Sequence, residues 1–226
     1  MTTYKTLFSL FLILLTVVFF AGCEEDEQTG NGETLETSAN NPGGEYLGQA
    51  LPGDEPELFA PGFINRGLYT RDVAITPEGD EFYFAVSFGN FTYSAIMFTK
   101  LVDGKWTEPE IASFCDLDYL NIEPFITPDG SKLFFLSNRP LEDDPENKKN
   151  ADIWVVDKTD DGWSEPYNLG EPINTEEDEF FPTVTTDGTL YFSRSPRGRR
   201  PTHLYRSRLV EGKYQEPEKL PDVVQV

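Results

Sequence analysis

The amino-acid sequence predicts an all-β protein that contains three copies of one four-stranded unit. A turn motif occurs three times and leads each time into an aromatic run: Thr76-Pro77-Glu78-Gly79, Thr127-Pro128-Asp129-Gly130 and Thr185-Thr186-Asp187-Gly188. Each copy ends alike, with an acidic residue and Gly, then an aromatic residue, then Glu-Pro, at 103–109, 161–166 and 211–217. The turn motifs are 51 and 58 residues apart, and no amphipathic helical pattern follows residue 20. Repeats of this length made of short strands and turns predict a β-propeller, a ring of four-stranded blades.

The first segment, 1–22, is predicted to be a targeting signal. Lys5 precedes an almost wholly apolar run from Leu7 to Phe20, which Ala21-Gly22-Cys23 closes. The run is too short for a stop-transfer helix, so it indicates secretion. The Cys at the junction makes the segment resemble a bacterial lipoprotein signal, which implies a lipidated Cys23. A plain secretion signal or an uncleaved anchor are the alternatives.

The next segment, 23–55, is predicted to be an acidic, disordered tether. It contains no Lys or Arg and is dominated by Gly, Asn, Thr, Pro and acidic residues. Such a composition buries too little apolar surface to offset the entropy of ordering the chain. Glu24-Glu25-Asp26-Glu27 directly after the Cys resembles the surface-export signal of Bacteroidetes lipoproteins. The alternative is an ordinary solvated spacer.

Residues 57–65 are predicted to form a lone outer strand, because Pro56 to Asn65 aligns with Glu165 to Asn174 in the second copy. Three blades then follow, at about 66–120, 121–175 and 176–226. A closed propeller needs at least about four blades. We therefore expect the sequence to be part of a six-bladed ring about twice this length. A half-propeller that pairs with another chain is the alternative.

The second copy shows the elements of a blade most clearly. Apolar or aromatic runs at 122–126, 133–136, 152–156 and 163–167 alternate with turn signals. In Thr-Pro-Asp-Gly, Pro presets φ at the second turn position and Gly closes the turn. Asp161-Gly162 tolerates the positive φ that a tight hairpin requires. Four antiparallel strands therefore follow one another in each copy.

These residues resemble the PD40, or WD40-like, repeats of TolB and related propellers of the bacterial envelope. The shared segments are 127–139, 152–155, 161–166, 168–174 and 178–182, and the resemblance extends from about residue 57 to the end of the sequence. The first copy departs from the pattern, since Ala95-Ile96-Met97 replaces Asp-Ile-Trp. The resemblance implies a fold and an envelope location, whereas propellers host binding, scaffold and catalytic roles alike.

Charge and motif content exclude several function classes. The net charge of −22 argues against nucleic acid, and against anionic membranes except through a lipid anchor. No G-x-S-x-G motif and no His or Cys cluster for zinc is present, His203 is the sole histidine, and no cofactor is predicted. We therefore predict no catalytic residues, although a glycosidase carboxylate pair distant in sequence remains open. Cys115 is expected to be a small buried hydrophobic residue.

Two groups of residues are candidates for binding. The first lies where each innermost strand begins and, by resemblance to propellers, faces the central channel: Arg71, Asp72, Glu123, Asp178 and Glu179. The second is a basic patch on this acidic protein: Arg194, Arg197, Arg199, Arg200 and Arg206. A simple strand start, or a solvated loop whose arginines pair with nearby carboxylates, explains the same residues without a ligand.

Two functional hypotheses follow. The first is a lipid-anchored binding or scaffold module for a protein or glycan partner, on the periplasmic or outer-surface side of the outer membrane. The second is part of a propeller enzyme, such as a glycan hydrolase, whose site is completed by residues outside this sequence.

Overall fold

The structure is a computed structural model that describes residues 41–89, 91–141, 150–196 and 200–221. The predicted signal, Cys23 and residues 23–40 of the predicted tether lie outside the described residues. Within the described ranges, no helix has the length and apolar character needed to cross a membrane.

Three antiparallel sheets, one per sequence repeat, confirm the all-β prediction. The first sheet contains β1 (Tyr69–Ile75), β2 (Glu81–Phe88), β3 (Tyr93–Val102) and β5 (Glu110–Ile111). The second contains β6 (Asn121–Ile126), β7 (Lys132–Ser137), β8 (Asp152–Thr159) and β10 (Tyr167–Asn168). The third contains β11 (Asp178–Val184), β12 (Leu190–Ser195), β13 (His203–Ser207) and β16 (Glu218–Lys219). Each pairs its strands in chain order, as the blades of a β-propeller do.

The turn motif forms as predicted in all three blades. In the second blade, Gly130 donates its N–H to the Thr127 carbonyl at 2.8 Å, and the Thr127 hydroxyl donates to Asp129 at 2.6 Å. The third blade repeats both bonds. Gly130 has a φ of 71°, a conformation that L side chains rarely adopt. The repeated motif is therefore explained by the geometry of this turn.

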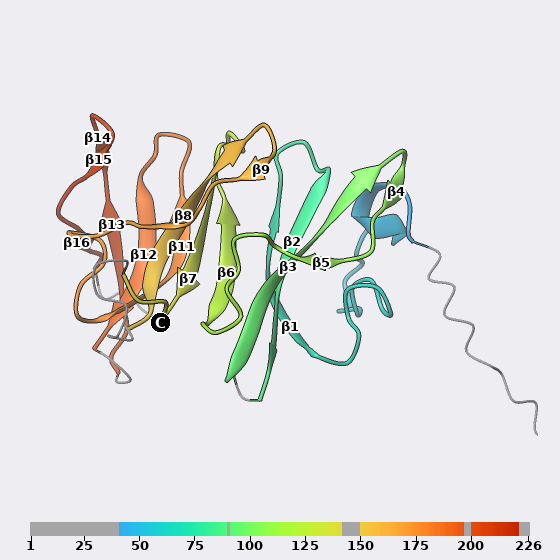
Figure 1. Ribbon diagram of the computed structural model, residues 1–226, viewed down its shortest axis with the longest axis horizontal. Coiled ribbons are helices and arrows are strands. Elements are labelled where there is room, and N and C mark those ends of the chain that lie inside the picture. Colours follow the sequence, from blue (N-terminus) through green and yellow to red (C-terminus); the bar gives the residue numbers. More distant parts are fainter. Residues whose placement is uncertain (1–40, 90, 142–149, 197–199, 222–226) are drawn as a thin grey trace, which may run out of the picture. The chain divides into compact units, whose positions relative to one another are not determined.

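In each blade, the hairpin that connects the third strand to the fourth extends beyond the sheet as a short two-stranded ladder. These ladders involve β4 (Lys105–Trp106), β9 (Gly162–Trp163), and β14 (Leu209–Val210) with β15 (Lys213–Tyr214). Each ladder carries an aromatic residue at the same register position: Trp106, Trp163 and Tyr214. Trp163 packs against the core shared with the first blade, and Tyr214 against the core shared with the second. The aromatic position of each copy therefore serves contact with the preceding part of the chain, which for Trp106 is the segment before the first blade. Figure 1 shows the sheets and these short ladders.

The predicted outer strand at 57–65 is wrong. The structure has turns there, with one bridge between Pro61 and Asn65, and the amides of Phe63 and Ile64 both donate to the Ala60 carbonyl. The similarity to the second copy lies in this turn, because the amides of Ile173 and Asn174 donate likewise to the Gly170 carbonyl. Buried Phe63 and Ile64 hold the segment against the first blade, so it needs no strand partner.

The tether prediction is also wrong for 41–49, whereas 50–55 is exposed and has no helix or strand. A short 3-10 segment, η1 (Glu45–Gly48), lies beside β4 (Figure 1). Its Leu47 is buried against Trp106, whose indole N–H donates to the Gly44 carbonyl at 2.9 Å. The apolar contact of Leu47 offsets the entropy that we expected to keep this segment disordered.

Candidate functional site

The innermost strands β1, β6 and β11 share an unusual backbone feature. Each has a β-bulge, at which a residue other than glycine adopts a positive φ: 50° at Asp72, 58° at Glu123 and 54° at Phe181. Each of these residues stands four positions before the threonine of the following turn. Such a conformation costs about 1–3 kcal/mol, so packing around the strand must maintain it. We call Asp72, Glu123 and Phe181 the bulge residues.

Arg71 connects all three bulge residues. Its Nε lies 2.5 Å from an Asp72 carboxylate oxygen, and its Nη2 lies 3.6 Å from Glu123. Its guanidinium carbon lies 5.6 Å from the ring centroids of both Phe181 and Phe91. One cation therefore contacts two carboxylates and two aromatic rings from three blades. We call Arg71, Phe91 and the bulge residues the inner cluster.

Glu123 is the buried member of the inner cluster. Its Oε2 accepts the backbone N–H of Phe181 at 2.7 Å, which fixes the third blade to the second. The pKa of Glu123 is raised to about 7, chiefly by burial and also by Asp72, although the Phe181 amide and Arg71 lower it. Glu123 can therefore hold or release a proton near neutral pH.

Exposed aromatic side chains extend the inner cluster across the first blade. Tyr69 meets Phe91 edge to face at 5.5 Å, and Phe88 stacks on Tyr93 at 5.2 Å. All four side chains are exposed, and Phe181 is 47% exposed. Aromatic residues and arginine are the residue types enriched at the centres of protein interfaces. Ring faces beside carboxylates also suit the apolar faces and hydroxyls of sugars.

The structure brings together three of the five predicted channel-facing residues: Arg71, Asp72 and Glu123. Asp178 accepts the backbone N–H of Ala151 at 3.1 Å and lines a pocket with Glu123, whereas Glu179 lies apart from them. Glu179 is fully buried, accepts hydrogen bonds from the Thr175 hydroxyl at 2.6 Å and Arg194 Nε at 2.8 Å, and therefore holds the crossover between the second and third blades. Burial raises the pKa of Glu179 to about 7 despite these bonds.

Phe181, and not Asp178 or Glu179, takes the bulge position in the third blade. Pro182 follows Phe181 as Pro124 follows Glu123, so counting back four residues from each turn threonine identifies Phe181 as the equivalent residue. Phe91 lies in the connection between β2 and β3, and no repeated motif marks it.

The described arginines of the predicted basic patch each have a separate environment. Arg194 pairs with buried Glu179 and donates to the Pro172 and Ile173 carbonyls. Arg206 pairs with Glu218 at 2.8 Å on the exposed surface. Arg200 lines a smaller pocket of about 470 Å³ beside Glu123 and Phe180. Arg197 and Arg199 lie outside the described residues.

Two other predicted features can be located. Cys115 packs against the core shared by the first two blades, and burial raises the pKa of its thiol to about 11, as expected of a structural cysteine. His203 begins β13 and pairs in register with Arg194. Among the residues that the structure describes, no group of three or more His, Cys, Asp or Glu side chains is arranged to hold a metal ion.

No family model matches the sequence, and no curated protein matches it. Solved structures that are similar to this one include a protein described as TolB from Agrobacterium tumefaciens, with 16% identity and a TM-score of 0.49 over 69% of this chain and 50% of that chain. A puromycin-hydrolyzing peptidase from Mycobacterium tuberculosis has 14% identity and a TM-score of 0.48 over 66% of this chain and 22% of that one. The catalytic domain of a GH62 α-L-arabinofuranosidase from Coprinopsis cinerea has 12% identity and a TM-score of 0.41, over 69% and 52%.

The chain thus spans half the length of the first of these structures. The assignment of its sheets as propeller blades rests on their repeated topology and on the turn motif that each copy shares.

Proposed function

We propose that this protein is a lipid-anchored β-propeller module of the bacterial envelope that binds a protein or glycan partner through the inner cluster. The observation that carries the proposal is Arg71, which contacts the rings of Phe91 and Phe181 and lies beside two carboxylates. The carboxylates and rings fix the guanidinium, so a partner that stacks on or bonds to it meets a preorganised group.

Crosslinking in cells tests this proposal. A photoreactive phenylalanine analogue replaces Phe91 in one variant and the exposed Val210, which lies on the hairpin of the third blade, in a matched control. We expect a crosslinked species from position 91 that is absent from position 210. Arg71→Glu should abolish it, and Arg71→Lys should weaken it because a lysine lacks the planar, stacking guanidinium. Equal crosslinking from both positions would contradict the proposal.

The same crosslink distinguishes the two kinds of partner. A protein partner gives a discrete band that protease treatment removes. A glycan partner gives a heterogeneous band that muramidase or another glycan hydrolase shifts.

The lipid anchor has its own test. Two or more acyl chains hold a protein stably on a membrane, whereas one does so marginally. Cys23→Ala should move the protein from the detergent phase to the aqueous phase in phase partitioning. Unchanged partitioning would contradict lipidation at Cys23.

A glycan hydrolase is the alternative, and one observation favours it. Glu123 is a buried carboxyl group whose pKa is about 7, and the carboxylate of Asp72 influences that pKa. A carboxyl group that titrates near neutral pH beside a second carboxyl group is the usual arrangement for acid catalysis on glycosidic bonds. Glycan cleavage by the wild type that Glu123→Gln abolishes would establish the enzyme; binding without cleavage supports the module.

A further inference from the structure

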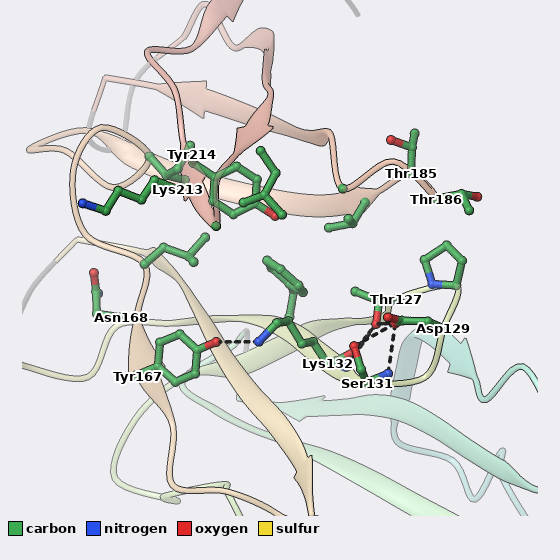
Figure 2. Close-up of a pocket in the computed structure, with 18 of the residues that line it drawn as sticks. Thr127, Asp129, Ser131, Lys132, Tyr167, Asn168, Thr185, Thr186, Lys213 and Tyr214 are labelled. Atoms are coloured by element: carbon green, nitrogen blue, oxygen red, sulfur yellow. Dashed lines mark hydrogen bonds between the residues drawn. The ribbon is translucent and has the colours of Figure 1, made fainter.

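A pocket of about 860 Å³ lies between the second and third blades, apart from the inner cluster. Its apolar wall consists of Phe134, Leu169, Ile173, Val184 and Leu209. Figure 2 shows Tyr214 on one side of the pocket, with Lys132 and Tyr167 on the other. This volume is within the range of small-molecule sites, about 300–1,000 Å³.

The same location between the first and second blades is occupied by the protein's own indole. There, Trp163 donates its N–H to the Tyr83 hydroxyl at 2.8 Å and meets the Tyr83 ring edge to face. Tyr83 also stacks on Phe98, with ring centroids 5.6 Å apart. Lys158, the register partner of Trp163, pairs with Glu81 at 2.9 Å.

Four of these residues are replaced between the second and third blades. By strand register, Phe134 replaces Tyr83, Val155 replaces Phe98, Tyr214 replaces Trp163, and Leu209 replaces Lys158. Each replacement removes volume or a polar group. The pocket is therefore the space that the larger side chains occupy at the neighbouring interface.

The replacements also leave a hydroxyl group without a partner. Tyr214 is half-buried, and burial, together with the nearby Tyr167, raises its pKa to about 12. Its equivalent, Trp163, bonds to a tyrosine hydroxyl, but Phe134 offers none. No described residue forms a hydrogen bond with the Tyr214 hydroxyl, which is available to a ligand as donor or acceptor.

Three of the other polar side chains that line the pocket are already engaged. The Lys132 amine bonds to Asp157 and to the Tyr167 hydroxyl, and Asn168 bonds to Asp152 and Asn174. Lys213 and Glu171 also line the pocket, and their charges are opposite. An apolar wall with one free hydroxyl, and a charged pair without net charge, suits an uncharged ligand. We propose that this pocket binds a small, uncharged fused-ring aromatic molecule that carries one hydrogen-bonding group, placed as the Trp163 indole is placed at the neighbouring interface.

Ligand-observed saturation-transfer NMR with indole as the probe tests this inference. We expect saturable binding with a dissociation constant of about 0.1–10 mM, since the probe has few atoms. In spectra of the protein, added indole should shift the backbone amide resonances of Leu169, Leu209 and Tyr214. Because 1-methylindole has no N–H to donate to the Tyr214 hydroxyl, it should bind about tenfold more weakly.

Two matched double variants give each interface the side chains of the other. Phe134→Tyr with Tyr214→Trp recreates the Trp163–Tyr83 pair inside the pocket and should abolish indole binding without lowering the melting temperature. Tyr83→Phe with Trp163→Tyr copies the open interface between the first two blades and should add a second, weaker site. Absence of saturable binding to the wild type, or binding that persists in the folded filled variant, would overturn the inference.

Discussion

Trp163 of the second blade donates its indole N–H to the hydroxyl oxygen of Tyr83 in the first, at 2.8 Å. The same hydroxyl donates to Glu81 at 2.7 Å, and Glu81 accepts Lys158 of the second blade at 2.9 Å. This chain of hydrogen bonds crosses the interface twice, each time with the donor on the second blade. Repeat proteins depend on such nearest-neighbour contacts, because each unit buries its faces only against the next.

A double-mutant cycle measures the Trp163–Tyr83 contact. Trp163→Phe and Tyr83→Phe each remove one partner and keep a ring in place. We expect a coupling energy of about 1 kcal/mol from urea unfolding, the usual contribution of one hydrogen bond. Additive effects of the two changes would show that the bond contributes nothing to stability.

Replacing the repeated aromatic residue by alanine should lower the free energy of unfolding by different amounts in different blades. Trp106 is 3% exposed and bonds to Gly44, whereas Trp163 is only partly buried. Trp106→Ala should lower the free energy of unfolding by about 3–5 kcal/mol, and Trp163→Ala by less. Urea melts of the two variants provide the comparison. A larger loss for Trp163→Ala than for Trp106→Ala would mean that contact between blades contributes more to stability than contact with the N-terminal segment.

Stability should depend on pH through Glu123. Its folded pKa of about 7 is above its ordinary value of 4.5, so the folded state binds the proton more tightly than the unfolded state does. The contribution of this carboxyl group is therefore fully present below about pH 4.5 and is lost as pH rises towards 7. Glu123→Gln, which keeps an acceptor for the Phe181 amide, should stabilise the protein by on the order of 1–3 kcal/mol at pH 8 and little at pH 4.5.

The control for this prediction is Glu165→Gln, a change at an exposed carboxylate. It should shift the unfolding free energy equally at both pH values. Glu179 also titrates near pH 7, so the pH dependence should diminish in Glu123→Gln without disappearing.

The sequence predicted those features that depend on local chemistry. Gly130 and its equivalents marked the turns, and Trp106, Trp163 and Tyr214 marked one packing position in each blade, because a repeat presents the same demand three times. The inner cluster was only partly predictable. Arg71, Asp72 and Glu123 follow from strand position, but Phe91 comes from a connection without a repeated motif. The N-terminal segment was misjudged because composition does not reveal that one leucine, Leu47, meets Trp106.

Cys115 should react slowly with thiol reagents in the folded protein. Burial raises the pKa of its thiol from 9.0 to about 11, so the reactive thiolate at pH 8 falls about 100-fold before access is considered. A chain that begins at residue 41 has no other cysteine, which makes labelling unambiguous. We expect labelling to follow the unfolding equilibrium as urea is added. Rapid labelling in the absence of urea would contradict the burial of this side chain.

The N-terminal segment should stabilise the first blade, and two deletions isolate its effect. A chain that begins at residue 41 keeps the bonds from Trp106 to Pro42 and Gly44, and keeps the buried Leu47. A chain that begins at residue 50 loses all three contacts. Loss of a buried leucine and of a hydrogen bond to a buried indole should lower the free energy of unfolding by about 2–4 kcal/mol in urea melts.

Leu47→Asp in the longer chain provides the matched point variant. It should reproduce most of that loss, because a carboxylate cannot replace the apolar contact with Trp106. Tyr46→Asp changes the exposed neighbour and should have little effect. Equal stability of the two deletion variants would show that 41–49 contributes nothing to the blade, and that burial of Trp106 depends on Ala60, Phe63 and Ile64 alone.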